Sequence, residues 1–209
     1  MEESCLDNVI RNFVLSHVYS KYYYHEITAT EKNLNGCNIR GNIKYELIDK
    51  DRFMIILVIP PYILNFQNRY YVFDRAELGI DIAIARKNDN VLSIIASNPP
   101  RILNKNYHHP FVYSHNGTLA YIEQDFEKRS GFNFGEELDI INNPEEPADK
   151  IVSLLRTGEV LLFKGLKFDS IYSIHKLDNL DCLIADSKED AFSYAITNGI
   201  KLERIFDNN

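Results

Sequence analysis

The first pattern along the chain is an amphipathic one. Between residues 5 and 24, apolar side chains recur every three or four positions, and polar side chains occupy the opposite side. This spacing predicts an N-terminal helix that lays its apolar face on a sheet. The consecutive tyrosines at 22–24 are expected to end the helix against the edge of the core. The apolar face consists of Leu6, Val9, Ile10, Phe13, Val14 and His17.

The next part of the chain has the patterns of β-strands. Apolar and polar residues alternate over 39–47, which predicts a strand with one buried face and one solvent-exposed face. The run 53–59 is apolar throughout, as in a central strand covered on both faces, and the proline pair at 60–61 is expected to stop it. Short connections predict an antiparallel meander. Further strands are predicted at 70–73, 79–86 and 91–96.

Residues 97–123 read SNPPRILNKNYHHPFVYSHNGTLAYIE and combine several backbone constraints. The prolines at 99–100 disfavour helix in the residues before them and end the preceding strand. A short edge strand is predicted over 101–106. A His-Pro pair at 109–110 sets an extended entry into an aromatic segment, and the Asn-Gly pair at 116–117 predicts a tight turn with a positive φ. The stretch is therefore expected to be rigid, irregular backbone, where a functional site would lie.

A long polar segment and a second helix are predicted next. Residues 125–146 are acidic and contain several glycines and asparagines, which predicts a loop that is either a functional flap or an insertion. A helix is predicted over 147–158, with proline in its first turn and Gly158 as its C-terminal cap. Residues 160–163 are then expected to form a short strand or a buried turn.

The C-terminal end of the chain has the pattern of a small β-α-β unit. Strands are predicted over 182–185 and 200–206, with a helix over 191–196 between them. Ser187 followed by Asp190 resembles a capping box at the start of this helix. A glycine shortly after the helix is the expected C-terminal stop.

Together these elements predict an α+β fold. An N-terminal helix and an antiparallel meander are followed by the proline pair, the His-Pro flap and a C-terminal helix, and the β-α-β unit is an appendage. We therefore divide the chain into an α+β domain over 1–165 and an appendage over 166–209.

Composition and charge narrow the class of protein. The 209 residues carry a formal net charge of -7, so a surface of clustered Lys and Arg for nucleic acid is not expected. No apolar run is long enough to span a bilayer, and the N-terminus is acidic where a signal peptide would be basic. Cys5, Cys37 and Cys182 have no CxxC spacing, which indicates free thiols in a reducing compartment. These features predict a cytoplasmic protein that binds neither nucleic acid nor membranes.

Few residues are candidates for chemistry. The motifs of nucleotide-binding loops, GxSxG hydrolases and HExxH metalloenzymes are missing. His108, His109 and His115 form a cluster in sequence, but neighbouring residues of an extended segment point to opposite faces, so a turn-stabilising role is favoured over a metal site. The cysteines lie outside this stretch and are interpreted as structural thiols. We therefore predict no cofactor, no metal ion and no catalytic residue.

The order of these features resembles that of the ubiquitin-conjugating (UBC) enzyme fold. The resemblance covers about residues 5–165 and leaves the appendage outside. The proline pair at 99–100 is similar to the pair that precedes the family's last strand. His109-Pro110, followed by Gly117, resembles the family's His-Pro-Asn flap. The resemblance implies a UBC-like α+β domain.

Two departures from the family's pattern bear on activity. In the family, the third residue of the flap is an asparagine that stabilises the oxyanion, and a cysteine after the flap carries the thioester. Phe111 stands at the asparagine position and offers no hydrogen-bond donor. Ala120 stands where the cysteine would fall. The resemblance therefore implies a pseudoenzyme that cannot form a thioester.

The expected function is that of a catalytically inactive binding or scaffolding module in a ubiquitin-like conjugation pathway. Its partner would be a ubiquitin-like protein or another protein of such a pathway. Exposed aromatic side chains of the flap would serve as anchors for this partner. The predicted binding residues are His109, Pro110, Phe111, Tyr113, Gly117, Ala120 and Tyr121.

Two other classes of protein remain open. One is a hydrolase or transferase on another α+β scaffold, which would use His109 or His115 with a carboxylate from residues 125–146. The other is a structural component whose C-terminal tail mediates oligomerisation. Histidine variants tested for activity would separate the enzyme from the binding module, and gel filtration with and without residues 164–209 addresses the third class.

Overall fold

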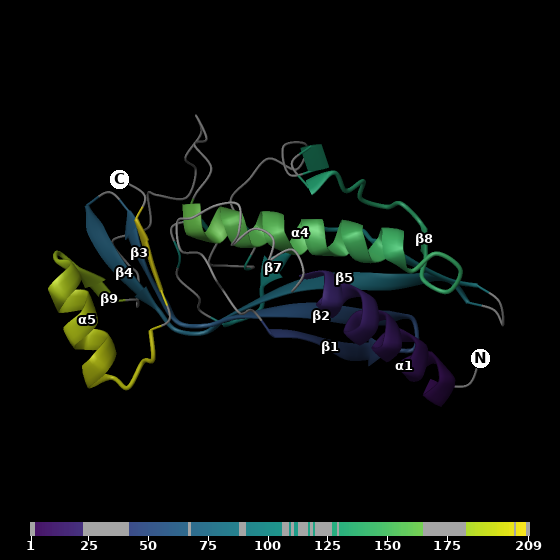
Figure 1. The fold of residues 1–209 in the computed structure, drawn as a ribbon, viewed down its shortest axis with the longest axis horizontal. Coiled ribbons are helices and arrows are strands. Elements are labelled where there is room, and N and C mark those ends of the chain that lie inside the picture. Colours follow the sequence, from purple (N-terminus) through teal and green to yellow (C-terminus); the bar gives the residue numbers. More distant parts are fainter. Residues whose placement is uncertain are drawn as a thin grey trace.

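The computed structural model describes residues 3–22, 42–66, 68–87, 91–105, 109, 111–112, 117, 119, 127–128, 130–164, 183–202 and 204–207. It has the predicted α+β class, in which an N-terminal helix and a later helix pack on an antiparallel meander sheet. Figure 1 shows a second, smaller sheet with its own helix at the other end of the molecule. None of the described helices is long and apolar enough to cross a membrane.

The predicted N-terminal helix is present. α1, Glu3–Asn12, continues into a π-helical segment, η1, Phe13–Val18, and the helical backbone extends to residue 22. Tyr22 is buried at the end of this helix, and the tyrosines at 23 and 24 lie outside the described residues. Most of the predicted apolar face is buried, which fixes the helix on the sheet. Its buried members are Leu6, Ile10, Phe13 and Val14, and Val18 extends the face.

The main sheet is an antiparallel meander. Its strands are β1 Asn42–Asp49, β2 Arg52–Ile59, β5 Ala76–Lys87, β6 Leu92–Ala96, β7 Arg101–Ile102 and β8 Leu138–Asp139. They lie in the order β1-β2-β5-β6-β8, and β7 also pairs with β5. The predicted central strand is confirmed, because β2 lies between β1 and β5 with Phe53, Ile55 and Leu57 buried. The predicted alternation in β1 fails at its end, where Leu47 is 40% exposed.

A second strand pair continues directly from the main sheet. β3, Tyr62–Phe66, and β4, Arg69–Phe73, keep the register of β2 and β5, since Ile59 pairs with Ala76 and Tyr62 pairs with Phe73. The prolines at 60–61 interrupt the ladder between the two pairs, so one long hairpin takes part in two sheets. β3 is not predicted by the sequence pattern, because a proline pair usually ends a strand, whereas here the strand resumes after it.

The C-terminal end forms the predicted β-α-β unit of β9 Leu183–Ala185, α5 Lys188–Thr197 and β10 Arg204–Asp207. The predicted cap is confirmed, because the Asp190 N–H donates to Ser187 Oγ at 3.1 Å. β9 pairs with β4 and β10 pairs with β3, which gives a second sheet in the order β10-β3-β4-β9. The unit therefore shares its sheet with the hairpin, and its separation as a domain of its own at residue 165 stays a prediction.

The later helix is longer than the sequence predicts. α4, Glu145–Lys164, continues through Gly158, so the predicted cap at this glycine is wrong. The prediction of a strand or turn over 160–163 is also wrong, because residues 161–163 are buried within the helix. The predicted loop over 125–146 is interrupted by β8 and ends in the first turn of α4. Packing against the core therefore outweighs the low helix propensity of glycine at position 158.

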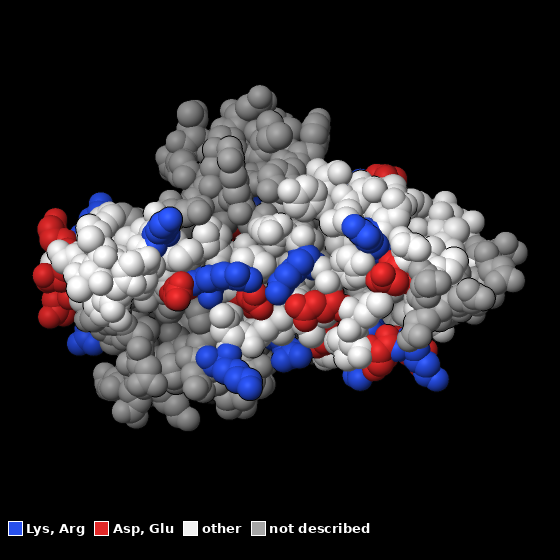
Figure 2. Space-filling model, turned by 90° about the horizontal axis from the view of Figure 1, so that it is seen from below, with Lys and Arg blue, Asp and Glu red and all other residues white. Residues whose placement is uncertain are grey.

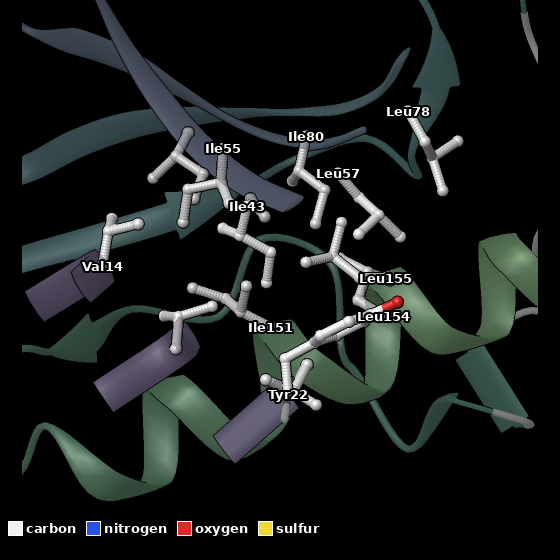
Figure 3. Close-up of a cluster of buried hydrophobic side chains, with 14 of the residues drawn as sticks. Val14, Tyr22, Ile43, Ile55, Leu57, Leu78, Ile80, Ile151, Leu154 and Leu155 are labelled. Atoms are coloured by element: carbon white, nitrogen blue, oxygen red, sulfur yellow. The ribbon is translucent and has the colours of Figure 1, made fainter. Parts of the chain in front are cut away.

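The hydrophobic core lies between the main sheet and the two helices, as Figure 3 shows. Side chains of the N-terminal helix meet those of the strands, and α4 closes the layer. The sheet supplies Ile43, Ile55, Leu57, Leu78 and Ile80, and the helices supply Val14, Tyr22, Ile151, Leu154 and Leu155. These side chains interdigitate in one continuous cluster, so both helices are fixed relative to the sheet.

One buried carboxylate ties the two helices together. Glu159 on α4 is 5% exposed, and its carboxylate accepts hydrogen bonds from the Tyr22 hydroxyl at 3.2 Å and from Arg156 Nη1 at 3.0 Å. The Arg156 guanidinium also lies 3.8 Å from the centroid of the Tyr22 ring. These contacts compensate the buried charge and fix the end of the N-terminal helix against α4.

Gly158 allows a close approach between α4 and the segment after the second proline pair. A Cβ at this position would lie 2.9 Å from a Leu78 methyl group and 3.5 Å from atoms of Leu119 and Pro100. We expect Gly158→Leu to lower the free energy of unfolding by about 2–3 kcal/mol, as overpacking does in a core. Gly158→Ala is the control, because only the Leu78 methyl must move and alanine adds about 1 kcal/mol of helix propensity. Urea unfolding measures both variants, and equal losses would contradict the close approach.

Candidate functional site

Within the stretch predicted to be functional, His109 contacts both the hairpin, through Phe73, and α4, through Leu162. The flap, residues 109–121, begins with the His-Pro pair, and Gly117 lies at its turn. Of the predicted binding residues, the structure describes His109, Phe111 and Gly117. The other four, Pro110, Tyr113, Ala120 and Tyr121, lie outside the described residues.

Gly117 occupies a backbone position that requires glycine. Its φ is 71°, in the left-handed region, and a Cβ at this position would overlap the carbonyl oxygen of Ile102. The Ile102 N–H donates to the Gly117 carbonyl at 2.8 Å, which joins the turn to β7. The positive φ predicted for this turn is therefore confirmed, and the turn is fixed to the main sheet.

The two sides of the turn are joined by a β-bridge. Val112 pairs antiparallel with Leu119, and both side chains are buried. Leu119 packs on α4 where Gly158 leaves room. The far side of the turn is thus held by the core, which makes the flap part of the rigid structure at the described positions.

His109 is a buried, neutral histidine. Its Nδ1 accepts a hydrogen bond from the Phe111 N–H at 3.0 Å, and its carbonyl accepts one from the Val112 N–H at 3.1 Å. Burial lowers the pKa of His109 to about 3, and a backbone hydrogen bond with Leu162 raises it only in part. The uncharged ring therefore holds the start of the flap in place, which favours a turn-stabilising role.

Aromatic rings of the hairpin surround the start of the flap. The centroid of the His109 ring is 4.5 Å from that of Phe73 and 6.3 Å from that of Tyr62. Phe111 packs edge-on against Phe66 at 5.0 Å between centroids. Phe111 is therefore half-buried rather than exposed, because it lies on the hairpin. The sequence alone does not reveal this contact, since β3 is not predicted.

Asn104 anchors the segment between β7 and the flap. Its Oδ1 accepts a hydrogen bond from the Glu77 N–H at 2.7 Å, and its Nδ2 donates to the Arg75 carbonyl at 3.0 Å. The Leu103 N–H donates to the Glu77 carbonyl at 2.8 Å. The amide side chain thus continues the ladder where β7 ends. Asn104 has no distinctive spacing in the sequence, so its role becomes visible only in the fold.

Glu136 and Asp139 of the predicted loop are engaged in structural contacts. Glu136 Oε1 lies 2.7 Å from Lys150 Nζ. Asp139 accepts hydrogen bonds from the Ile141 N–H at 2.9 Å and from the Asn142 N–H at 3.1 Å. Within the described ranges, no group of three or more His, Cys, Asp or Glu side chains is placed to hold a metal ion. The described part of the flap is a rigid, uncharged corner, not a poised acid, base or nucleophile.

A separate groove of about 550 Å³ lies between α1 and the residues before α4. Cys5, an exposed thiol, and His17 both line it. The two positions are twelve residues apart, which separates these side chains by about 18 Å along a helix, too far for a nucleophile and its base. The His17 ring instead contacts Glu145 at 2.7 Å, which joins η1 to α4. The groove therefore carries no Cys-His dyad.

Comparison with protein-family models, curated proteins and solved structures finds no match for this chain. A function therefore has to be inferred from the fold and the flap.

Proposed function

We propose that this chain is a catalytically inactive UBC-like module that binds a ubiquitin-like protein or another protein of a conjugation pathway. The proposal rests on the arrangement of the flap. A buried neutral His109 opens it, Gly117 turns it against β7, and Ala120 follows in sequence where the family has its cysteine. Such a flap presents a defined shape and aromatic side chains to a partner, and it has no cysteine at the position of the family's reactive sulfur.

The topology of the main sheet supports a UBC-like fold. After the N-terminal helix, β1, β2, β5 and β6 form a four-strand antiparallel meander, and the prolines at 99–100 follow it directly. The hairpin β3–β4 extends two of these strands and adds none to the meander. α4 follows the flap and packs on the same core. This order is the one that the family resemblance implies.

The side chains of the flap support a binding role over a catalytic one. Phe111 takes the place of the family's asparagine, and its ring packs on Phe66 instead of offering a donor to an oxyanion. The alternative enzyme would use His109 or His115 with a carboxylate from 125–146. A general base works best with a pKa near the operating pH, whereas the pKa of His109 is about 3. The enzyme therefore has less support than the binding module.

The binding proposal predicts that an aromatic anchor of the flap carries much of the affinity. We expect Tyr113→Ala to weaken binding of a ubiquitin-like protein by about tenfold or more, as the loss of an interface tyrosine commonly does. The measurement is a titration of ¹⁵N-labelled ubiquitin, and of other labelled ubiquitin-like proteins, with the full chain.

Tyr194→Ala is the matched control for this titration. Tyr194 is 36% exposed and lies on α5, outside the predicted binding residues. It should leave the affinity unchanged. If no ubiquitin-like protein binds the wild-type chain, or if both tyrosine variants weaken binding equally, the proposal is wrong.

A further inference from the structure

β1 is the outer strand of the main sheet, as far as the described residues define it. Among the described strands it pairs with β2 alone, over the register from Asn42 opposite Val58 to Leu47 opposite Phe53. The register then shifts between Leu47 and Asp49, so the flat part of the strand ends at this bulge. An unpaired edge of this length presents backbone N–H and C=O groups that can template a further strand.

Two apolar side chains of this strand are exposed. Leu47 is 40% exposed and Ile48 is 44% exposed, although both belong to β1. The Tyr45 hydroxyl donates to Asp7 Oδ1 at 3.1 Å, which places one flank of α1 beside the strand. Large exposed apolar side chains on an edge strand indicate a surface that a partner covers.

The charges on β1 favour a second copy of this chain as the partner. Lys44 and Glu46 lie on the same face of the strand, and Lys44 Nζ is 3.2 Å from both Glu46 Oε1 and Glu77 Oε1. In a twofold antiparallel pairing about Tyr45, Lys44 of one copy stands opposite Glu46 of the other. A pairing centred on residue 44 or 46 instead sets like charges opposite each other. Opposite charges across a strand pair stabilise it, and like charges destabilise it.

We infer that β1 is a self-association surface, on which a second copy of this chain adds its own β1 antiparallel about Tyr45. Ile43 of one copy then faces Leu47 of the other, so an exposed leucine gains an apolar neighbour. Residues 43–47 are the paired segment, and the bulge ends it on both sides. Figure 2 shows basic and acidic side chains interleaved on the face that lies lowest in Figure 1. The β1 edge combines charge complementarity with exposed apolar groups.

Sedimentation velocity of the full chain over a range from low to several hundred micromolar tests this inference. The wild-type chain is expected to shift from monomer to dimer. Lys44→Glu and Glu46→Lys should each weaken the dimer by about tenfold or more, because each sets like charges opposite twice in the symmetric pair. The double variant K44E/E46K exchanges the two charges and should restore the dimer.

Two variants with the same charge changes are the controls. Lys50→Glu lies beyond the paired segment, and Glu189→Lys lies on α5, so neither should alter the dimer. Thermal unfolding of all variants checks that they fold. A chain that stays monomeric throughout, single variants that dimerise like the wild type, or a double variant that stays weak would each overturn the inference. So would a dimer that Ile196→Asp on α5 dissociates, because the contact would then lie on the tail. None of these results bears on binding at the flap.

Discussion

Gly117→Ala is expected to lower the free energy of unfolding by about 3–5 kcal/mol. Alanine at a φ of 71° is strained by about 1–2 kcal/mol on its own. Its methyl group would in addition overlap the Ile102 carbonyl oxygen, which is backbone and cannot rotate away. Relief requires the turn to leave β7, and the hydrogen bond from the Ile102 N–H to the Gly117 carbonyl is then lost. Urea unfolding followed by circular dichroism measures the loss.

Two other glycines separate backbone strain from overlap. Gly131 and Gly135 have φ values of 66° and 83°, and a Cβ at either position meets no atom within 4 Å. Alanine at either should therefore cost only the strain, about 1–2 kcal/mol. If the free energy of unfolding falls equally in all three variants, the tight contact between the turn and β7 does not stabilise the flap. Binding of a partner at the flap should fall with Gly117→Ala and not with the two controls.

Acidification from pH 7 to pH 4.5 is expected to remove about 2.5 kcal/mol of stability through His109 alone. The pKa of the folded state is about 3 because the ring is buried, whereas that of an unfolded histidine is about 6.5. Below pH 6.5 the unfolded chain therefore binds a proton that the folded chain does not. Stability falls by up to about 1.4 kcal/mol per pH unit as the pH decreases towards 3.

His109→Asn should abolish this part of the pH dependence. The asparagine carbonyl can accept the hydrogen bond from the Phe111 N–H, but it does not titrate. The variant is less stable than the wild type at pH 7, and its stability should change less between pH 7 and 4.5. Val112→Ala is the control, since it removes buried volume from the same corner and should keep the wild-type slope. Parallel slopes for the wild type and His109→Asn would show that the histidine is accessible and titrates normally.

The parts of the fold with strong local patterns follow from the sequence. The N-terminal helix, β2 and the capped helix α5 each have a periodic or uniform pattern that matches their final environment. β3 and the C-terminal part of α4 could not be predicted in this way, because tertiary contacts there override the local signals of proline and glycine. The prolines at 60–61 lie between two strand pairs that share one register. Gly158 lies where α4 approaches Leu78 closely.

The candidate site was predictable in its backbone and not in its surroundings. An Asn-Gly pair and a His-Pro pair have conformational meaning on their own, so the turn at Gly117 and the structural role of His109 follow from local chemistry. The contacts of Phe111 with Phe66 and of Asn104 with Glu77 join segments far apart in sequence. Such contacts depend on the hairpin, and the exposure expected for Phe111 was wrong for that reason.

The hairpin that enters both sheets has a consequence for synthesis of the chain. β3 and β4 leave the ribosome early, yet their outer neighbours β9 and β10 lie near the C-terminus. Until residues 183–207 have been made, the nascent protein exposes both edges of the β3–β4 hairpin, and exposed strand edges are where incompletely folded proteins aggregate. Deletion of β10 should therefore lower solubility more than the loss of four residues suggests.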